Sequence, residues 1–317
     1  MEETTQQGKA KLDARAWLIM SALAITGQLA WAVENTWFGT FAYDRIRPDM
    51  SIVATMTSVT AIVATLTTIL MGTLSDRTRS KLGRRRPFIL FGYLFWGLMT
   101  ILFPMSAFFK STSVAVLMVV LLDSLMTFFG STANDAAFNA WTAEITPPSQ
   151  RGKVEGVLNV CLFIAQIISY TLAGMLIDQF DYFIFFYSLG AVVMLVGILA
   201  GRKLPEPPLS SADKPTASFW QDIKGLFRWQ TVRENPELFK LLLMIMISSI
   251  GMQVSLPYLV IYVENYLRFS KTEFSLIGAA IMVGSLLISL PFGLLADKFN
   301  RKWMLIIAIL MSAIGCF

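Results

Sequence analysis

Residues 71–88 read MGTLSDRTRSKLGRRRPF, a basic segment between two long apolar stretches. Residues 292–303 read FGLLADKFNRKW and repeat its core in a shorter form. Both segments contain the pattern G-x-L-x-D followed by Arg or Lys, which here comprises Gly72, Asp76, Arg77, Gly293, Asp297 and Lys298. A signature that occurs twice between hydrophobic stretches indicates a chain with two related halves. The sequence therefore predicts a duplicated, all-α, polytopic membrane protein.

The composition agrees with this prediction, because 55% of the 317 residues are hydrophobic and only 15% are charged. A stretch of about 20 apolar residues can cross a bilayer as a helix. Eight such stretches are predicted, at 16–41, 51–74, 87–108, 113–144, 153–178, 182–203, 238–264 and 273–296. A ninth begins near Lys302 and is still too short for a crossing at Phe317. We therefore expect the chain to break off inside helix nine.

The distribution of Lys and Arg predicts the topology. With the N-terminus in the cytoplasm, 21 of the 26 Lys and Arg residues fall on the cytoplasmic side. This bias follows the positive-inside rule. We expect a multi-pass protein of the cell membrane whose basic surplus faces the lipid bilayer, so the net charge of +5 requires no nucleic acid. The first stretch contains Gln28, Glu34 and Asn35, which favours a retained helix over a cleaved signal peptide.

The predicted domains follow from a change in character after the sixth stretch. Residues 1–204 form a six-helix bundle, and residues 238–317 form part of a second bundle. Residues 205–237 are polar and begin with several prolines, so they are predicted to be a cytoplasmic linker. The linker contains a short amphipathic helix, indicated by apolar residues at helical spacing, namely Phe219, Trp220, Ile223, Leu226 and Phe227. Two bundles joined in this way can rock around a central site.

The repeated loop resembles that of the major facilitator superfamily. Its second copy keeps the family spacing D-[RK]-x-G-[RK]-[RK], with Asn300 at the glycine position. The longer first copy resembles the glycoside–pentoside–hexuronide cation symporters and the sucrose transporters. The end of the fourth stretch, AAFNAWTAEITPPSQRGKVEG at 136–156, is similar to the same sugar symporters. The resemblance implies a monomeric carrier that takes up a sugar or glycoside by alternating access.

The Gly–Asp loops are predicted to gate the cytoplasmic side. Gly72 and Gly293 have no side chain, so another helix can approach closely at either position. Asp76 and Asp297 lie where a helix leaves the membrane and can pair with a nearby cation. The alternative is that the basic residues of these loops, including Arg77 and Lys298, only enforce topology.

The fourth stretch contains the largest number of polar residues. An ionisable group at mid-bilayer costs roughly 2.5–3.5 kcal/mol, so each one requires an explanation. At helical spacing, one polar arc comprises Asp123, Thr127, Ser131, Asn134, Asp135, Asn139 and Thr142. We expect Asn134, Asp135 and Asn139 to face a substrate cavity, and Ser131 and the threonines to form interhelical hydrogen bonds. Resemblance places Asp135 at a carboxylate that binds sugar in the symporters, whereas Asp123 could equally snorkel or pair.

The first stretch adds Gln28, Trp31 and Asn35 on one helical face. Trp31 could stack on a sugar ring while the two amides exchange hydrogen bonds with hydroxyls, although an aromatic belt at the interface is the alternative for Trp31. Glu34 lies beside them and is the candidate proton carrier of this helix, together with Asp135. The alternative for Glu34 is a structural ion pair with an arginine on the helices expected beyond Phe317.

The expected coupling ion is H⁺ rather than Na⁺. The second stretch has no acidic residue, unlike the sodium-using sugar symporters, and the chain contains no His, so carboxylates must handle any proton. The sequence has no Ser–His–Asp set, metal-ligand cluster or phosphate-binding glycine loop, so we expect neither an enzyme nor a metal or cofactor. The alternatives are an exporter of amphipathic compounds and a truncated, non-transporting membrane fragment.

Overall fold

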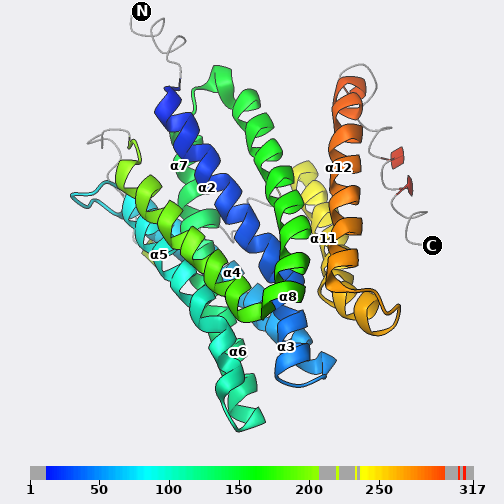
Figure 1. Ribbon diagram of the computed structural model, residues 1–317. Coiled ribbons are helices and arrows are strands. Elements are labelled where there is room, and N and C mark those ends of the chain that lie inside the picture. Colours follow the sequence, from blue (N-terminus) through cyan, green and yellow to red (C-terminus); the bar gives the residue numbers. More distant parts are fainter. Residues whose placement is uncertain are drawn as a thin grey trace, which may run out of the picture.

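The structure is a computed structural model that describes residues 12–206, 219–220, 233, 236–296, 306–307 and 310–311. Every element with assigned bounds in these ranges is a helix (Figure 1). Within the same ranges, strand-like pairing is confined to one isolated bridge between Ser80 and Gly83, in a loop. The fold class is therefore all-α, as predicted.

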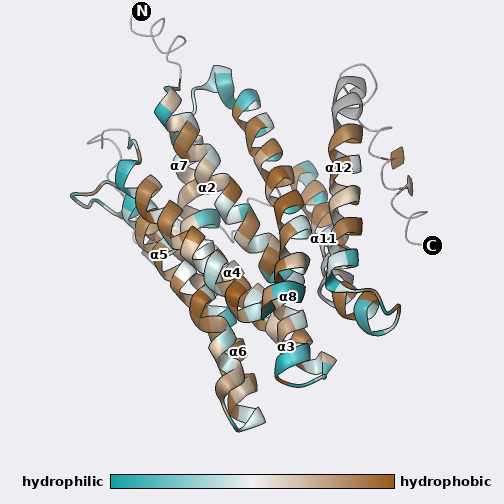
Figure 2. Cartoon of the chain, in the orientation of Figure 1, coloured by the Kyte–Doolittle hydropathy of each residue, from teal (hydrophilic) through white to brown (hydrophobic). Residues whose placement is uncertain are grey.

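The helices join end to end into long rods. In chain order the elements are α2 Ala14–Val33, η2 Glu34–Phe38, α3 Gly39–Arg45, α4 Met50–Arg77, α5 Arg86–Leu102, η3 Phe103–Phe108, α6 Thr112–Gly130, η4 Ser131–Phe138, α7 Asn139–Ile145, η5 Pro148–Gln150, α8 Arg151–Lys203, α11 Pro236–Asn265 and α12 Lys271–Ala296. The elements α2, η2 and α3 together make the first rod, and α4 is the second. The elements α5 and η3 make the third rod, and α6, η4 and α7 make the fourth. Among the described residues, six helical segments are long and apolar enough to cross a membrane, one of them the double segment Pro148–Lys203. Figure 2 shows apolar residues along the rods and hydrophilic residues at their ends.

The longest element, α8, is two crossings joined at one residue. Its 53 residues would extend about 80 Å at 1.5 Å per residue, far more than the roughly 30 Å of a bilayer core. Asp181 has φ 75° and breaks the helix. The two parts correspond to the predicted stretches 153–178 and 182–203. The other described stretches also begin and end close to the predicted positions, with α3 extending four residues beyond the predicted end at 41.

Acidic side chains cap two of the rods. Asp13 accepts a hydrogen bond from the backbone nitrogen of Ala16 at 2.7 Å, and Asp49 accepts one from that of Ser51 at 2.9 Å. Such caps satisfy amides that have no partner within the helix. Hydrogen bonds from Ser51, through its side chain and its backbone amide, hold the pKa of Asp49 below its ordinary value.

The core of the first bundle is aromatic. Phe38 of the first rod stacks on Phe103 with ring centroids 4.0 Å apart, and Phe186 of α8 meets both rings edge-on. Trp37 and Trp96 are also fully buried. From the second half, α12 packs along α8, and α11 contacts α3, η2 and α4 (Figure 1).

The two ends of the molecule differ in charge. The end that contains the α4–α5 connection and the start of α8 is rich in arginine, and we call it the basic end. The other end contains the α3–α4 connection, Asp181 and the α11–α12 connection, and we call it the opposite end.

Candidate functional site

Two π-helical segments interrupt the first and fourth rods. η2 contains Glu34 and Asn35, and η4 contains Asn134 and Asp135. A π turn distorts the regular ladder of backbone hydrogen bonds and often occurs at functional sites. Four of the polar residues selected from the sequence therefore lie in the two distorted segments of otherwise regular rods.

Glu34 connects the first rod to the fourth. Thr127 donates a hydrogen bond to Glu34 Oε1 at 2.9 Å, while Glu34 Oε2 has no hydrogen-bond partner in the part of the chain that the structure describes. The Glu34 carboxyl also interacts electrostatically with Asp123 and Asp135. Three acidic side chains of two rods therefore share one region of the bundle interior.

Asn134 is buried between the first and third rods. The Tyr93 hydroxyl lies 2.9 Å from the carbonyl oxygen of Leu23 and 3.2 Å from Asn134 Oδ1. Gly27 allows this packing, because a Cβ there would lie 2.7 Å from the Tyr93 hydroxyl. Asn134 Nδ2 donates to Asp135 Oδ1 at 3.3 Å, so the amide holds the carboxylate in place.

The predicted substrate residues Gln28, Trp31 and Asn139 lie on the same two rods as Glu34 and Asp135. Asp135 interacts with the side chain of Trp31, whose ring packs on Trp96 at a centroid distance of 5.0 Å. Asn139 is exposed and donates to the backbone oxygen of Asp135 at 3.2 Å. Gln28 is half-buried on α2. The structure thus places Trp31, Asn134, Asp135 and Asn139 together, and their contact with a substrate stays a prediction.

Asn35 borders two cavities. One has a volume of about 40 Å³ and lies between the first, second and fourth rods, with polar lining from Glu34, Asn35, Asp123, Thr57 and Thr60. The other has a volume of about 130 Å³ and lies between the two halves, with lining from Asn35, Thr36, Gln166, Tyr170, Val260 and Phe274. Sequence reasoning missed Gln166 and Tyr170, because each is an isolated polar group in an apolar stretch. The π turn of the first rod thus faces both cavities.

At the basic end, Arg85 forms ion pairs with two other helices of the first bundle. Arg85 is 3% exposed and pairs with Asp76 of α4 and with Glu144 of α7, the latter at 2.6 Å between Arg85 Nη2 and Glu144 Oε1. Arg84 also pairs with Glu144, at 2.7 Å. The sequence did not distinguish Arg85 from its arginine neighbours. Asp76 thus has its partner within the first bundle.

The carboxylate of Glu206 holds the beginning of α5. It accepts hydrogen bonds from the backbone amides of Arg84, Arg85 and Arg86, with 2.8 Å from Arg85 N to Oε1. An anion at a helix N-terminus satisfies free amides and complements the helix dipole. The residues just after α8 are therefore attached to the first bundle.

The predicted cytoplasmic gate is only partly described. Arg77 ends α4 and Gly293 lies in α12, whereas Asp297 and Lys298 lie outside the described residues. A Cβ at Gly72 would meet nothing within 4 Å, so no described helix packs directly against that position. A gate formed by both loops stays a prediction for a state in which the basic ends come together.

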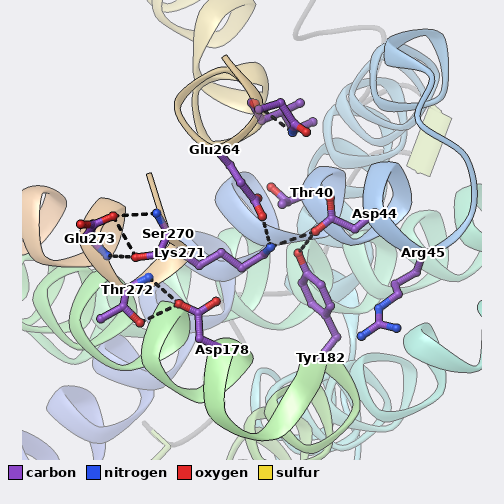
Figure 3. A network of polar contacts seen from close by, with 12 residues as sticks. Thr40, Asp44, Arg45, Asp178, Tyr182, Glu264, Ser270, Lys271, Thr272 and Glu273 are labelled. Carbon is purple, nitrogen blue, oxygen red and sulfur yellow. Dashed lines mark hydrogen bonds and ion pairs between the residues drawn. The ribbon is translucent and has the colours of Figure 1, made fainter. Parts of the chain in front are cut away.

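A network of polar contacts joins the two halves at the opposite end (Figure 3). Lys271 at the start of α12 lies 3.1 Å from Asp44 of α3, measured from Nζ to Oδ2, and forms a second ion pair with Glu264 of α11. Tyr182 of α8 donates its hydroxyl to Asp44 Oδ2 at 2.7 Å. The sequence analysis did not select these residues, because their contacts depend on the packing of distant rods.

A second set of contacts extends the network along α8. Asp178 Oδ2 accepts hydrogen bonds from the backbone nitrogen of Thr272 at 2.9 Å and from its hydroxyl at 2.7 Å. Farther in, the backbone nitrogen of Gly174 donates to the hydroxyl of Ser275 at 3.1 Å, and a Cβ at Gly174 would collide with Ser275. At this end the two halves are therefore in direct contact.

Comparison with known proteins places the chain in a family. A sequence model of the Major Facilitator Superfamily matches residues 15–264 and 241–317. An uncharacterized MFS-type transporter of Methanocaldococcus jannaschii is 25% identical over 261 residues, 81% of this chain and 62% of the relative. The uncharacterized MFS-type transporter YhcA of Bacillus subtilis is 23% identical over 221 residues, 55% of this chain and 41% of the relative.

Among solved structures, the chain is similar to a bacterial homolog of the human lysosomal transporter Spinster, in an inward-facing and unoccupied conformation. The TM-score is 0.64 at 15% identity, over 92% of this chain and 64% of that chain. The chain therefore spans less than two thirds of the length of these relatives. The match of the family model to most of the chain shows that the chain belongs to the Major Facilitator Superfamily of transporters, as the resemblance of its loops indicated.

Proposed function

We propose that the protein is a proton-coupled symporter of a sugar or glycoside that works by alternating access. The observation that carries this proposal is the position of the π turn at Glu34 and Asn35. This turn borders a water-sized cavity with two carboxyl groups on one side and a cavity between the two halves on the other. A change of protonation at Glu34 can therefore act on the surface where the halves meet.

Proton coupling is supported by the surroundings of the acidic groups. An ionised carboxylate in a membrane interior needs a cation or several hydrogen-bond donors. In the described part of the chain, no salt bridge involves Glu34, Asp123 or Asp135, and the hydrogen-bond donor to Glu34 is a neutral hydroxyl. Carboxyl groups in such surroundings are suited to binding and releasing protons. H⁺ thus remains the preferred coupling ion, and no cofactor is invoked.

Alternating access is supported by the asymmetry between the ends. The two halves are linked at the opposite end through Lys271 and Asp178, whereas Gly72 at the basic end has open space beside it. The positive-inside rule places the basic end in the cytoplasm. The Spinster homolog to which the chain is similar is inward-facing. We therefore assign this structure to a cytoplasm-facing state, in the cell membrane, with the N-terminus inside.

The sugar assignment depends on chemistry and on the resemblance of the loops. Sugar hydroxyls are bound by carboxylates and amides, and sugar rings pack on aromatic side chains. Asp135 and Asn139 of the fourth rod, with Gln28, Trp31 and Asn35 of the first, supply these groups. The cavity of about 130 Å³ between the halves is smaller than the 300–1,000 Å³ typical of ligand pockets, so the substrate would enter when the halves separate further.

Proton uptake provides the test. Cells that express the protein, suspended in weakly buffered medium, are given each sugar of a panel of mono- and disaccharides and plant glycosides. We expect at least one sugar to make the medium more alkaline, and cells with Asp135→Asn to lose that response. If no sugar of the panel alters the pH of the medium while the protein is present in the membrane, the sugar–proton assignment is wrong.

A second candidate function is export of amphipathic compounds. A cavity of about 150 Å³ between α2 and α8 has an almost entirely apolar lining, including Leu29, Val33, Leu172 and Leu189, which favours an amphipathic solute. Energy-dependent efflux of a fluorescent amphipathic dye, with no sugar-induced pH change, would support this function. Absence of both activities would favour a non-transporting membrane fragment.

A further inference from the structure

Asp123 is a buried acidic residue with one carboxyl oxygen that accepts no hydrogen bond from the described residues. Its side chain is 3% exposed, and Asp123 Oδ1 has no hydrogen-bond partner among the described residues. Asp123 lines the cavity of about 40 Å³ from the fourth rod, opposite Glu34 of the first. Burial of a polar atom without a partner destabilises the folded state. A group that bears such a cost inside a membrane bundle requires an explanation beyond packing.

Asp123 lies one helical turn before Thr127, the residue of the fourth rod that contacts Glu34. Thr127 links the two, because its hydroxyl lies 2.9 Å from Glu34 Oε1 and 2.9 Å from the backbone oxygen of Asp123.

The groups around the pair are neutral or acidic. Glu34 interacts electrostatically with Asp123 and, more weakly, with Asp135. The second rod contributes Val53, Met56, Thr57 and Thr60 to the cavity, and none of these carries a charge. Two carboxylates in such a site repel each other strongly when both are ionised, which favours a state with one proton on the pair.

The cavity is of the right size for water and too small for a sugar. A buried water needs roughly 10–15 Å³ and two or more polar partners, so about 40 Å³ holds up to about three waters. Asn35, Thr57 and Thr60 provide neutral hydrogen-bonding groups beside the two acids. A proton can therefore pass between Asp123 Oδ1 and Glu34 Oε2 through water, since neither oxygen has another hydrogen-bond partner among the described residues.

We propose that Asp123 and Glu34 form one acid pair that shares the coupling proton, with Asp123 as a proton-handling residue in addition to those of the proposed function. When Asp123 gives its proton to the Glu34 carboxylate, it becomes the carboxylate itself, and the pair keeps a charge of −1. The assignment deepens the proposed function and rests on it for its role in transport. The existence of the pair can be tested without any sugar.

The test uses the purified protein in lipid nanodiscs and infrared difference spectra recorded as the pH is varied. The C=O band of protonated Glu34 is identified as the band that Glu34→Gln removes. In Asp123→Asn we expect the pH midpoint of this band to move by about one unit or more, as for strongly interacting sites. Ser124→Ala is the matched control, because its hydroxyl bonds within its own helix to the backbone oxygen of Val120 at 2.7 Å. Its midpoint should not move.

Asp123→Glu keeps a carboxyl in the pair, so the pH midpoint of the Glu34 band should stay close to its wild-type value. This variant therefore distinguishes the loss of a proton-sharing partner from a general disturbance of the fold. A Glu34 band whose midpoint is the same in the wild type and in Asp123→Asn would overturn the proposal. So would the absence of any titrating Glu34 band in the wild type. A coupled pair combined with no sugar-induced pH change would leave the pair intact and reject the sugar–proton function.

Discussion

Lys271 Nζ lies 3.1 Å from Asp44 Oδ2, so one ammonium group joins α12 of the second half to the first rod of the first half. Lys271 also pairs with Glu264, and Asp44 also accepts the Tyr182 hydroxyl. The side chains of Lys271 and Asp44 are only 11% and 20% exposed. Partly buried pairs of this kind are less screened by salt than surface pairs, so their loss has a measurable effect.

Replacement of Lys271 by Gln should loosen the opposite end. In a protein with Cys161 and Cys316 changed to Ala, a cysteine placed at Gln166 reports whether the cavity between the halves is open. We expect Lys271→Gln to raise the rate at which an impermeant maleimide outside intact cells labels this cysteine, by several-fold. Lys240→Gln is the matched control, because Lys240 forms an exposed pair with Glu237. Equal labelling rates in the two variants would contradict a closing role for Lys271.

Replacement of Arg85 by Gln should destabilise the first bundle. Arg85 is almost fully buried, and its loss leaves Glu144 with fewer partners, although Asp76 is 59% exposed and can be solvated. We expect a loss of about 2–3 kcal/mol in the free energy of unfolding, below the value for a fully buried pair. Thermal unfolding in detergent, followed by tryptophan fluorescence, measures this change. Arg47→Gln, at an exposed pair with 3.7 Å to Asp49, should change stability by less than about 0.5 kcal/mol.

Replacement of Asp135 by Asn should abolish sugar binding while the fold persists. The substituted amide occupies the same volume and can still interact with Asn134, but it is a weaker acceptor for sugar hydroxyls. Binding of the sugar identified by the uptake test is measured by isothermal calorimetry on the purified protein. Asp49→Asn, at an exposed helix cap, should bind as the wild type does. Sugar binding at wild-type strength by Asp135→Asn would remove Asp135 from the site.

Replacement of Gly72 by Leu should reduce transport without reducing stability if Gly72 belongs to a cytoplasmic gate. The structure has open space beside Gly72, so the larger side chain should leave the unfolding temperature unchanged. If the basic ends close during the transport cycle through a helix approaching this position, uptake should fall at least tenfold. Uptake at the wild-type rate, with the same amount of protein in the membrane, would show that Gly72 takes no part in a gate.

The rods could be predicted from the sequence because long apolar runs end where charged residues and prolines begin. The first stretch was placed at 16–41, and the corresponding rod runs over Ala14–Arg45. The π turns could not be predicted, since one extra residue per turn leaves little trace in an apolar pattern. The amphipathic helix of the linker is described only at Phe219 and Trp220, which are helical, and its other residues lie outside the described ranges.

The acidic and amide residues of the first and fourth rods could be selected because polar groups inside a membrane are costly and therefore conspicuous. The pairing of those residues was beyond sequence reasoning. Nothing in the spacing of Asp123 indicates that Thr127 would bring Glu34 beside it. Likewise, Arg85 differs from Arg84 and Arg86 only in the direction of its side chain, which depends on the positions of α4 and α7.

The Glu206 carboxylate accepts hydrogen bonds from the three backbone amides at the start of α5, so a division of the protein into two fragments should keep Glu206 with the first bundle. Because this carboxylate belongs to the first bundle, the covalent bridge to the second half begins at residue 207 rather than at the end of α8. Genes that split the chain between 207 and 218 would leave the described helices of each fragment whole. Two such fragments, produced together, should reassemble in the membrane through the packing of α12 on α8 and the Lys271 and Asp178 contacts.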